Sequence, residues 1–81
     1  MYKCLCCGFL TLSEQPPGTF EICPVCNWED DAAQAADPTL EHGANRVSLE
    51  QARTNFARTG ASSEDAIGVV RSPLPEEIPD R

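Results

Sequence analysis

Apolar and polar residues alternate near the N-terminus with the period of β-strands. Residues 9–13 (Phe-Leu-Thr-Leu-Ser) are compatible with a short strand, and residues 19–22 (Thr-Phe-Glu-Ile) alternate polar and apolar. Between them, residues 14–18 contain two prolines and a glycine, which is typical of a turn. The pattern predicts an antiparallel hairpin with a five-residue loop, and the apolar face formed by Phe20 and Ile22 needs cover.

The clearest helical period follows at residues 48–59. Ser48 is a suitable N-cap, Gln51 would complete a capping box, and Gly60 follows as a C-cap. One face of this helix is apolar and the residues away from it are polar, with Leu49, Ala52 and Phe56 on the first and Glu50, Asn55 and Arg58 on the second. We expect the helix to pack on the hairpin through its apolar face.

Weaker signals lie between these two regions. Residues 28–36 are compatible with a short helix, because acidic residues in its first turn suit the helix dipole and Asp37-Pro38 would end it. Residues 36–45 show no clear period and are expected to form a loop.

After Gly60 the chain turns polar, and residues 67–70 (Ile-Gly-Val-Val) are compatible with a short edge strand. Three prolines then favour extended backbone: Pro73, Pro75 and Pro79. The prediction is a single domain over residues 1–70, followed by an extended Pro/Glu tail over residues 71–81.

The size of the chain limits its core. A domain of 81 residues buries only about 60% of the surface that its unfolded chain exposes, so a metal, disulfides or a partner is expected to supplement the core. No stretch approaches the roughly 20 apolar residues of a membrane span, and Met1 runs directly into polar sequence without an apolar signal region. We therefore expect a cytoplasmic protein, in which paired cysteines indicate metal or redox chemistry before disulfides.

Composition narrows the range of partners. The formal net charge is −7, and only six lysines and arginines are spread along the chain. General affinity for nucleic acids depends on clustered basic side chains, so nucleic-acid binding is disfavoured. A local patch formed by Arg46, Arg53 and Arg58 keeps a nucleic-acid-binding zinc ribbon as the alternative.

The chemistry is concentrated in two C-x-x-C turns. Cys4 and Cys7 form the first and Cys23 and Cys26 the second, with 15 residues between them, a spacing typical of a four-cysteine zinc site. The residue after the second cysteine of each turn needs a positive φ. This residue is Gly8 in the first turn and Asn27 in the second, and both residue types adopt positive φ at low cost. The interpretation is a small α+β metal-bound domain, a zinc ribbon with rubredoxin-type knuckles and a β-hairpin, and one main packed α-helix.

Four protein sulfurs around one Zn²⁺ leave no open coordination position, so the expected role of the ion is structural. Two alternatives use similar turns: a rubredoxin-type iron site, and a redox-active dithiol. Cys6 is interpreted as a spare, exposed thiol, although it could replace Cys4 or Cys7 as a ligand. His42, the only histidine, is interpreted as an ordinary loop residue.

A run of acidic residues follows the second turn. Glu29, Asp30 and Asp31 come directly after Trp28. The simplest interpretation is helix capping with a solvated face; the alternatives are a recognition patch for a basic partner, with Trp28 included, and a second metal-binding or acid–base site. Arg46 and Arg53 are candidates for pairing with these carboxylates.

Several stretches together resemble the cysteine-rich CPCC family of small bacterial proteins. They are Cys4-Leu-Cys-Cys-Gly8, Ile22-Cys-Pro-Val-Cys-Asn-Trp-Glu-Asp-Asp31, Asp37-Pro38, Gly43-Ala-Asn45, Ser48-Leu-Glu-Gln-Ala-Arg53 and Val70-Arg-Ser-Pro73. Leu5 replaces the proline of the motif that names the family, which leaves every sulfur in place. The resemblance implies a bacterial zinc-binding module and transfers no catalytic residues.

Taken together, these features predict a non-enzymatic zinc protein that binds a protein partner through an acidic surface. A basic partner fits this charge, and neither a membrane nor a small-molecule substrate is predicted. The alternatives are the nucleic-acid-binding zinc ribbon and the rubredoxin-like iron protein.

Overall fold

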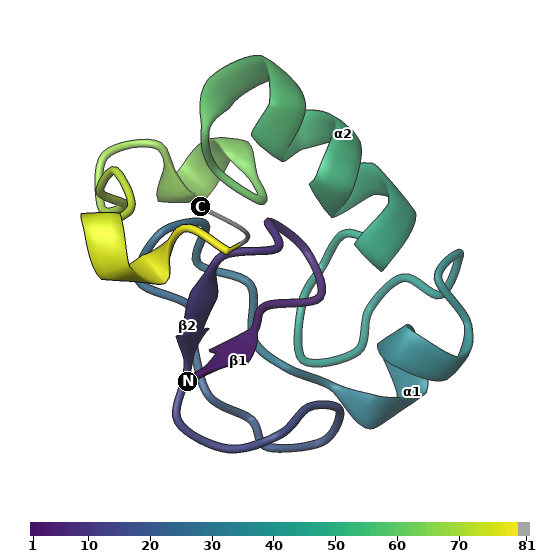
Figure 1. Ribbon diagram of the computed structural model, residues 1–81. Helices are drawn as coiled ribbons and strands as arrows, with labels where there is room; N and C mark the ends of the chain where they lie inside the picture. The colour runs from purple at the N-terminus through teal and green to yellow at the C-terminus, as the bar shows by residue number, and fades with distance from the viewer. Residues whose placement is uncertain (80–81) are drawn as a thin grey trace.

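The computed structural model describes residues 1–79 and contains two short strands, two α-helices and two 3-10 turns. Strands β1 (Tyr2–Lys3) and β2 (Leu10–Leu12) pair antiparallel, with Tyr2 opposite Leu12 and Lys3 opposite Leu10. The helices are α1 (Ala32–Ala36) and α2 (Leu49–Thr59), and the 3-10 turns are η1 (Glu64–Ala66) and η2 (Pro75–Glu77). In Figure 1 the loop between β1 and β2 points toward α2, while α1 lies at the lower right of the view.

The predicted hairpin between residues 9–13 and 19–22 is wrong. Each C-x-x-C turn instead reverses the chain within its own hairpin: knuckle 1 (residues 4–8) joins β1 to β2, and knuckle 2 (residues 23–27) joins 19–22 to 28–30. A knuckle brings its flanking residues together over a short loop, so local pairing costs less chain entropy than pairing across the proline-rich turn.

Backbone hydrogen bonds define this second, irregular hairpin. The Phe20 N–H donates to the Asp30 carbonyl, the Asp30 N–H to the Glu21 carbonyl, both at 2.9 Å, and the Cys23 N–H to the Trp28 carbonyl at 3.0 Å. Residues 13 and 14 reach this hairpin only through the side chain of Glu21, whose carboxylate accepts from both of their N–H groups.

The core lies around the cysteines and not under residues 19–22. Phe20 and Ile22, expected beneath the main helix, are 62% and 57% exposed. The buried apolar cluster contains Cys4, Cys6, Leu12, Cys23, Val25, Cys26, Trp28, Leu49 and Ala52. Residues 19–22 form the outer arm of the second hairpin, so Phe20 and Ile22 stay outside the buried cluster.

Helix α2 confirms the predicted element and both of its ends. The Ser48 hydroxyl accepts from the Gln51 N–H at 3.0 Å, and Gly60 takes a left-handed conformation with φ of 84°. The capping box is only half formed, since the Gln51 amide donates to Asn55 at 2.8 Å instead of turning back. Asn55, expected away from the packed face, is buried because its amide donates to the Ser62 carbonyl at 2.9 Å.

The apolar face of α2 packs as expected, though on a different partner. Leu49 and Ala52 are fully buried, and the half-buried Phe56 meets Phe9 edge to face, with ring centroids 6.2 Å apart. Phe9 lies between knuckle 1 and β2. The helix therefore covers the cysteine turns directly.

The short helix is confirmed over Ala32–Ala36 only, because Asp31 is its N-cap. The loop that follows is organised by Gln34, a residue that the sequence analysis did not single out. Its fully buried amide nitrogen donates to the carbonyls of Leu40, Asn45 and Val47, and its oxygen accepts from the backbone and side chain of Asn45. One side chain thus satisfies the loop's inward-facing backbone groups.

The C-terminal segment differs from its prediction in two places. No strand forms at residues 67–70, because the N–H groups of Ile67 and Val69 close turns onto Glu64 and Ala66. The expected tail is not extended throughout: the 3-10 turn η2 packs beside β2. Residues 80 and 81 of that tail lie outside the described residues.

The η2 turn is held by an ion pair. Arg71 and Glu77 form two hydrogen bonds of 2.8 and 2.9 Å, and the Arg71 guanidinium holds the pKa of Glu77 below its ordinary value. None of the helices over residues 1–79 has the length and apolar character needed to cross a bilayer.

Replacing Gly43 with alanine tests the loop built on Gln34. A Cβ at Gly43 would lie 2.8 Å from two side-chain carbons of Gln34 and 2.9 Å from Asp31 Oδ2. Because Gln34 is fully buried and hydrogen-bonded, it cannot move aside, and we expect Gly43→Ala to lower the free energy of unfolding by about 1–3 kcal/mol. Urea unfolding at one fixed free-metal concentration measures this change.

Gly68→Ala is the matched control, because a Cβ there meets no atom within 4 Å. We expect its effect to stay within about 0.5 kcal/mol of the wild type. Equal effects of the two substitutions would contradict the proposed packing at Gly43.

Candidate metal centre

The two knuckles bring four sulfurs to one point. The Sγ atoms of Cys4, Cys7, Cys23 and Cys26 all lie within 4.8 Å of one another. Cys4 and Cys26 are 3.6 Å apart and Cys7 and Cys23 are 3.7 Å apart, so each close pair joins one knuckle to the other. The structure thus brings together the four sulfurs that the cysteine spacing predicts as ligands.

Each knuckle has the backbone geometry that its sequence predicts. The Gly8 N–H donates to the Cys4 carbonyl at 2.9 Å, and the Asn27 N–H donates to the Cys23 carbonyl at 2.7 Å. These tight turns place Gly8 at φ of 81° and Asn27 at 71°, in the left-handed region. Glycine and asparagine adopt that region at the lowest cost, which explains both residues.

The cluster fits a tetrahedral metal ion. Zinc–sulfur bonds of about 2.3 Å give sulfur–sulfur edges of about 3.8 Å in a tetrahedron, close to the two short separations. Two donors partly offset the thiolate charge: the Thr11 hydroxyl lies 3.0 Å from Cys23 Sγ, and the Trp28 N–H donates to Cys26 Sγ at 3.5 Å. Four cysteines in this geometry could bind one metal ion.

Crowding of the thiols couples their protonation. The pKa of Cys23 lies below the ordinary thiol value, chiefly because the thiols of Cys26 and then Cys4 donate to its sulfur, and the pKa of Cys26 is raised by the same contact with Cys23. A metal ion must replace the protons held in this cluster, so its binding releases protons and weakens as the pH falls.

The C-terminal half of the chain holds both knuckles from outside. The Ser62 N–H donates to the Cys26 carbonyl at 2.8 Å, and the Arg71 N–H donates to the Pro24 carbonyl at 3.3 Å. The Arg53 side chain of α2 donates to the Leu5 carbonyl at 2.9 Å. Arg53 was a candidate for pairing with the carboxylates of residues 29–31, and its side chain binds knuckle 1 instead.

The sequence of the chain matches a known protein family. The model of the family described as cysteine-rich CPCC covers residues 2–77, nearly the whole chain. The chain belongs to the cysteine-rich CPCC family. A comparison with curated proteins returns no significant match.

In this CPCC protein Cys6 stands apart from the four-sulfur group. It was expected to be an exposed thiol, but it is only 8% exposed and belongs to the apolar core. The two-residue spacing explains the difference, because it turns Cys4 and Cys7 toward knuckle 2 and leaves Cys6 to pack. His42 lies in an exposed loop, with 81% of its side chain accessible, and is not part of the four-sulfur group.

Most side chains of the acidic segment after knuckle 2 (residues 28–31) are buried or hydrogen-bonded within this CPCC protein. Trp28 is 2% exposed and lies in the core, and Asp30 is 1% exposed and accepts from the backbone and hydroxyl of Thr19 at 2.9 and 2.8 Å. Asp31 caps α1 and accepts from the Ala44 N–H, which holds its pKa below the ordinary value. Trp28 and Asp30 are therefore not accessible to a partner, and only Glu29 and Asp31 reach the surface.

Sequence reasoning missed the residues that support the centre. Thr11 carried the only available signal, since it is the one polar residue within the apolar run of residues 9–12. Ser62 and Arg53 act through contacts with segments far along the chain, which no local pattern marks.

Single alanine substitutions test the assignment of the ligands. Replacing Cys4, Cys7, Cys23 or Cys26 opens the tetrahedron, so we expect each variant to lose its metal to a competing chelator that leaves the wild type at about one ion per chain. Metal analysis after dialysis against the chelator provides the measurement.

Cys6→Ala is the matched control and should retain the metal. Loss of metal from Cys6→Ala together with retention in Cys4→Ala or Cys7→Ala would mean that Cys6 is the ligand in knuckle 1.

Proposed function

We propose that this chain is a non-enzymatic zinc protein in which one Zn²⁺ has a structural role. The supporting observation is the four-sulfur cluster, whose four cysteines would fill every position of a tetrahedral ion. A zinc ion held in this way binds no water to activate, so its contribution is to the stability of the fold. Zinc is the proposed ion because thiolate ligands at tetrahedral separations suit it.

We further propose that the zinc-stabilised domain is a cytoplasmic module that binds a basic protein. Its formal charge of −7 favours association with basic surfaces and disfavours nucleic acids. The working surface would be acidic, and the burial of Trp28 and Asp30 confines it to the carboxylates that remain accessible.

The metal is tested by expressing the protein with equal supplies of zinc and iron. We expect a colourless product with about one zinc per chain and no spectral change on adding dithionite. A coloured, dithionite-sensitive iron protein would favour the rubredoxin-like alternative and contradict the structural zinc.

Removing the metal should also unfold the protein. A chain of 81 residues has a small core, and much of its buried cluster consists of the cysteines themselves, so we expect loss of near-ultraviolet circular dichroism on adding a chelator and its recovery on adding zinc. Retention of the full signal in the metal-free protein would contradict a structural role.

A further inference from the structure

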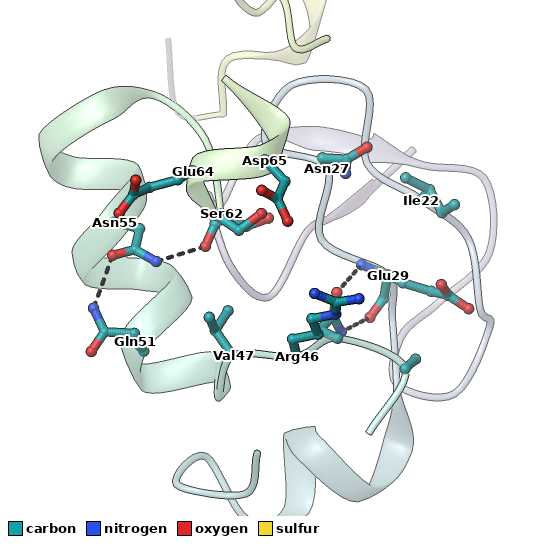
Figure 2. A pocket seen from close by; sticks show the side chains of 13 residues that line it. Ile22, Asn27, Glu29, Arg46, Val47, Gln51, Asn55, Ser62, Glu64 and Asp65 are labelled. Atoms are coloured by element: carbon teal, nitrogen blue, oxygen red, sulfur yellow. Dashed lines mark hydrogen bonds between the residues drawn. The ribbon is translucent and has the colours of Figure 1, made fainter. Parts of the chain in front are cut away.

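A hollow of about 640 Å³ lies beside the metal centre. Its walls come from three parts of the chain: knuckle 2 with both of its arms, the loop of residues 44–47, and the segment from α2 to η1. Figure 2 shows Asn27 and Glu29 on one side, Gln51 and Asn55 on the other, and Arg46 between them. Its volume lies within the range of ligand sites, about 300–1,000 Å³.

The hollow carries an excess of negative charge. Glu29, Glu64 and Asp65 line it together with a single cation, Arg46. The ion pairs over residues 1–79 are His42 with Glu41 and Arg71 with Glu77, so these three carboxylates have no cationic partner among the residues that the structure describes. Uncompensated carboxylates on opposite walls favour a cation between them.

A buried hydroxyl at the same place also lacks a partner. Ser62 is 3% exposed and lines the hollow, and its hydroxyl makes no hydrogen bond with the residues that the structure describes. Asp30 Oδ1 is the one side-chain atom over residues 1–79 that is both sealed from solvent and unpaired, so the Ser62 hydroxyl remains open to the hollow. It offers an acceptor beside the carboxylates of Glu64 and Asp65.

The side-chain amide of the neighbouring Asn55, unlike the Ser62 hydroxyl, has hydrogen-bond partners. Asn55 is buried to a similar degree, but its side chain is satisfied by Gln51 on one side and the Ser62 carbonyl on the other. Asn55 therefore shapes the wall, and the hydroxyl of Ser62 is left for a ligand.

We propose that this hollow, the Ser62 groove, receives an arginine or lysine side chain from a basic segment of a protein partner. The inference rests on the proposed function: of residues 28–31 it keeps Glu29 as a contact, and it adds Ser62, Glu64 and Asp65. The carboxylates and the hydroxyl supply acceptors, and a guanidinium or ammonium group supplies only donors.

The groove is preorganised by the bonds that hold knuckle 2. The Glu29 N–H donates to Asn45 at 2.9 Å and the Asn45 amide returns a bond of 2.8 Å to the Glu29 carbonyl. On the opposite wall the Ser62 N–H is tied to the Cys26 carbonyl at 2.8 Å. Both walls are therefore set before a ligand arrives, which reduces the entropy lost on binding.

The test measures binding of a labelled hexa-arginine peptide to the zinc-loaded protein by fluorescence anisotropy. We expect the double variant Glu64→Gln and Asp65→Asn to weaken binding about tenfold, because two of the three carboxylates that line the groove lose their charge. The matched control, Glu14→Gln with Glu76→Gln, removes the same charge at exposed carboxylates outside the groove and should weaken binding less than about twofold.

A second pair of variants removes positive charge instead of negative charge. Arg46→Gln removes the repelling cation of the groove and should strengthen binding about threefold, whereas Lys3→Gln, on β1 outside it, should change binding by less than about 1.5-fold. Amide chemical shifts on titration should change most at Ser62, Asp65 and Asn27.

Several outcomes would overturn the proposal. Equal weakening by the groove and control double variants would show attraction to net charge alone, and shifts confined to another face would place the contact elsewhere. Tighter binding of spermine than of hexa-arginine would make the occupant a polyamine, and binding of hexa-glutamate with shifts at Arg46 would make it an anion. Zinc content measured on the same samples keeps a failure of the groove distinct from a failure of the structural metal.

Discussion

The convergence of four sulfurs on one point is the constraint on which the other contacts depend. The two strands together contain only five residues, so sheet pairing contributes little order. The knuckles reverse the chain twice, and the segments flanking each knuckle pair because the knuckle brings them together. α2 and the residues after it then close over both turns through Arg53, Ser62 and Arg71. A metal at this point would join all of these segments, and its binding energy would become folding energy.

Outside the two short strands, polar side chains bind the backbone groups that a larger sheet would pair. Glu21 holds residues 13 and 14, Asp30 holds Thr19, and Asp31 holds Ala44, each through backbone N–H groups. Gln34 does the same for a longer loop with both ends of its amide. In a chain with so little ladder bonding, these side-chain contacts satisfy backbone groups that strands would otherwise pair. Part of the acidic composition therefore belongs to the architecture.

The sequence predicted the features that depend on neighbouring residues. Cysteine spacing, the positive φ at Gly8 and Asn27, and the helix from Ser48 to Gly60 are each determined within a few positions, and each is confirmed. Strand pairing was wrong because the alternation in residues 19–22 indicates extended backbone without naming its partner. The burial of Trp28 and Asp30 and the role of Gln34 depend on segments 10 or more residues away, so no local pattern could reveal them.

Some carboxylates are used by hydrogen bonds within the fold and others are not, and this difference also bears on recognition. Glu21, Asp30, Asp31, Asp37 and Glu77 accept hydrogen bonds from named donors in the chain, and a partner could use them only by breaking those bonds. The side chains of Glu29, Glu64 and Asp65 accept none from the described residues, and they meet in one hollow with an unpaired serine hydroxyl. A charged group without a structural bond keeps its full capacity for a ligand. The proposed recognition therefore rests on these three residues, on walls positioned by the same knuckle that carries half of the candidate metal site.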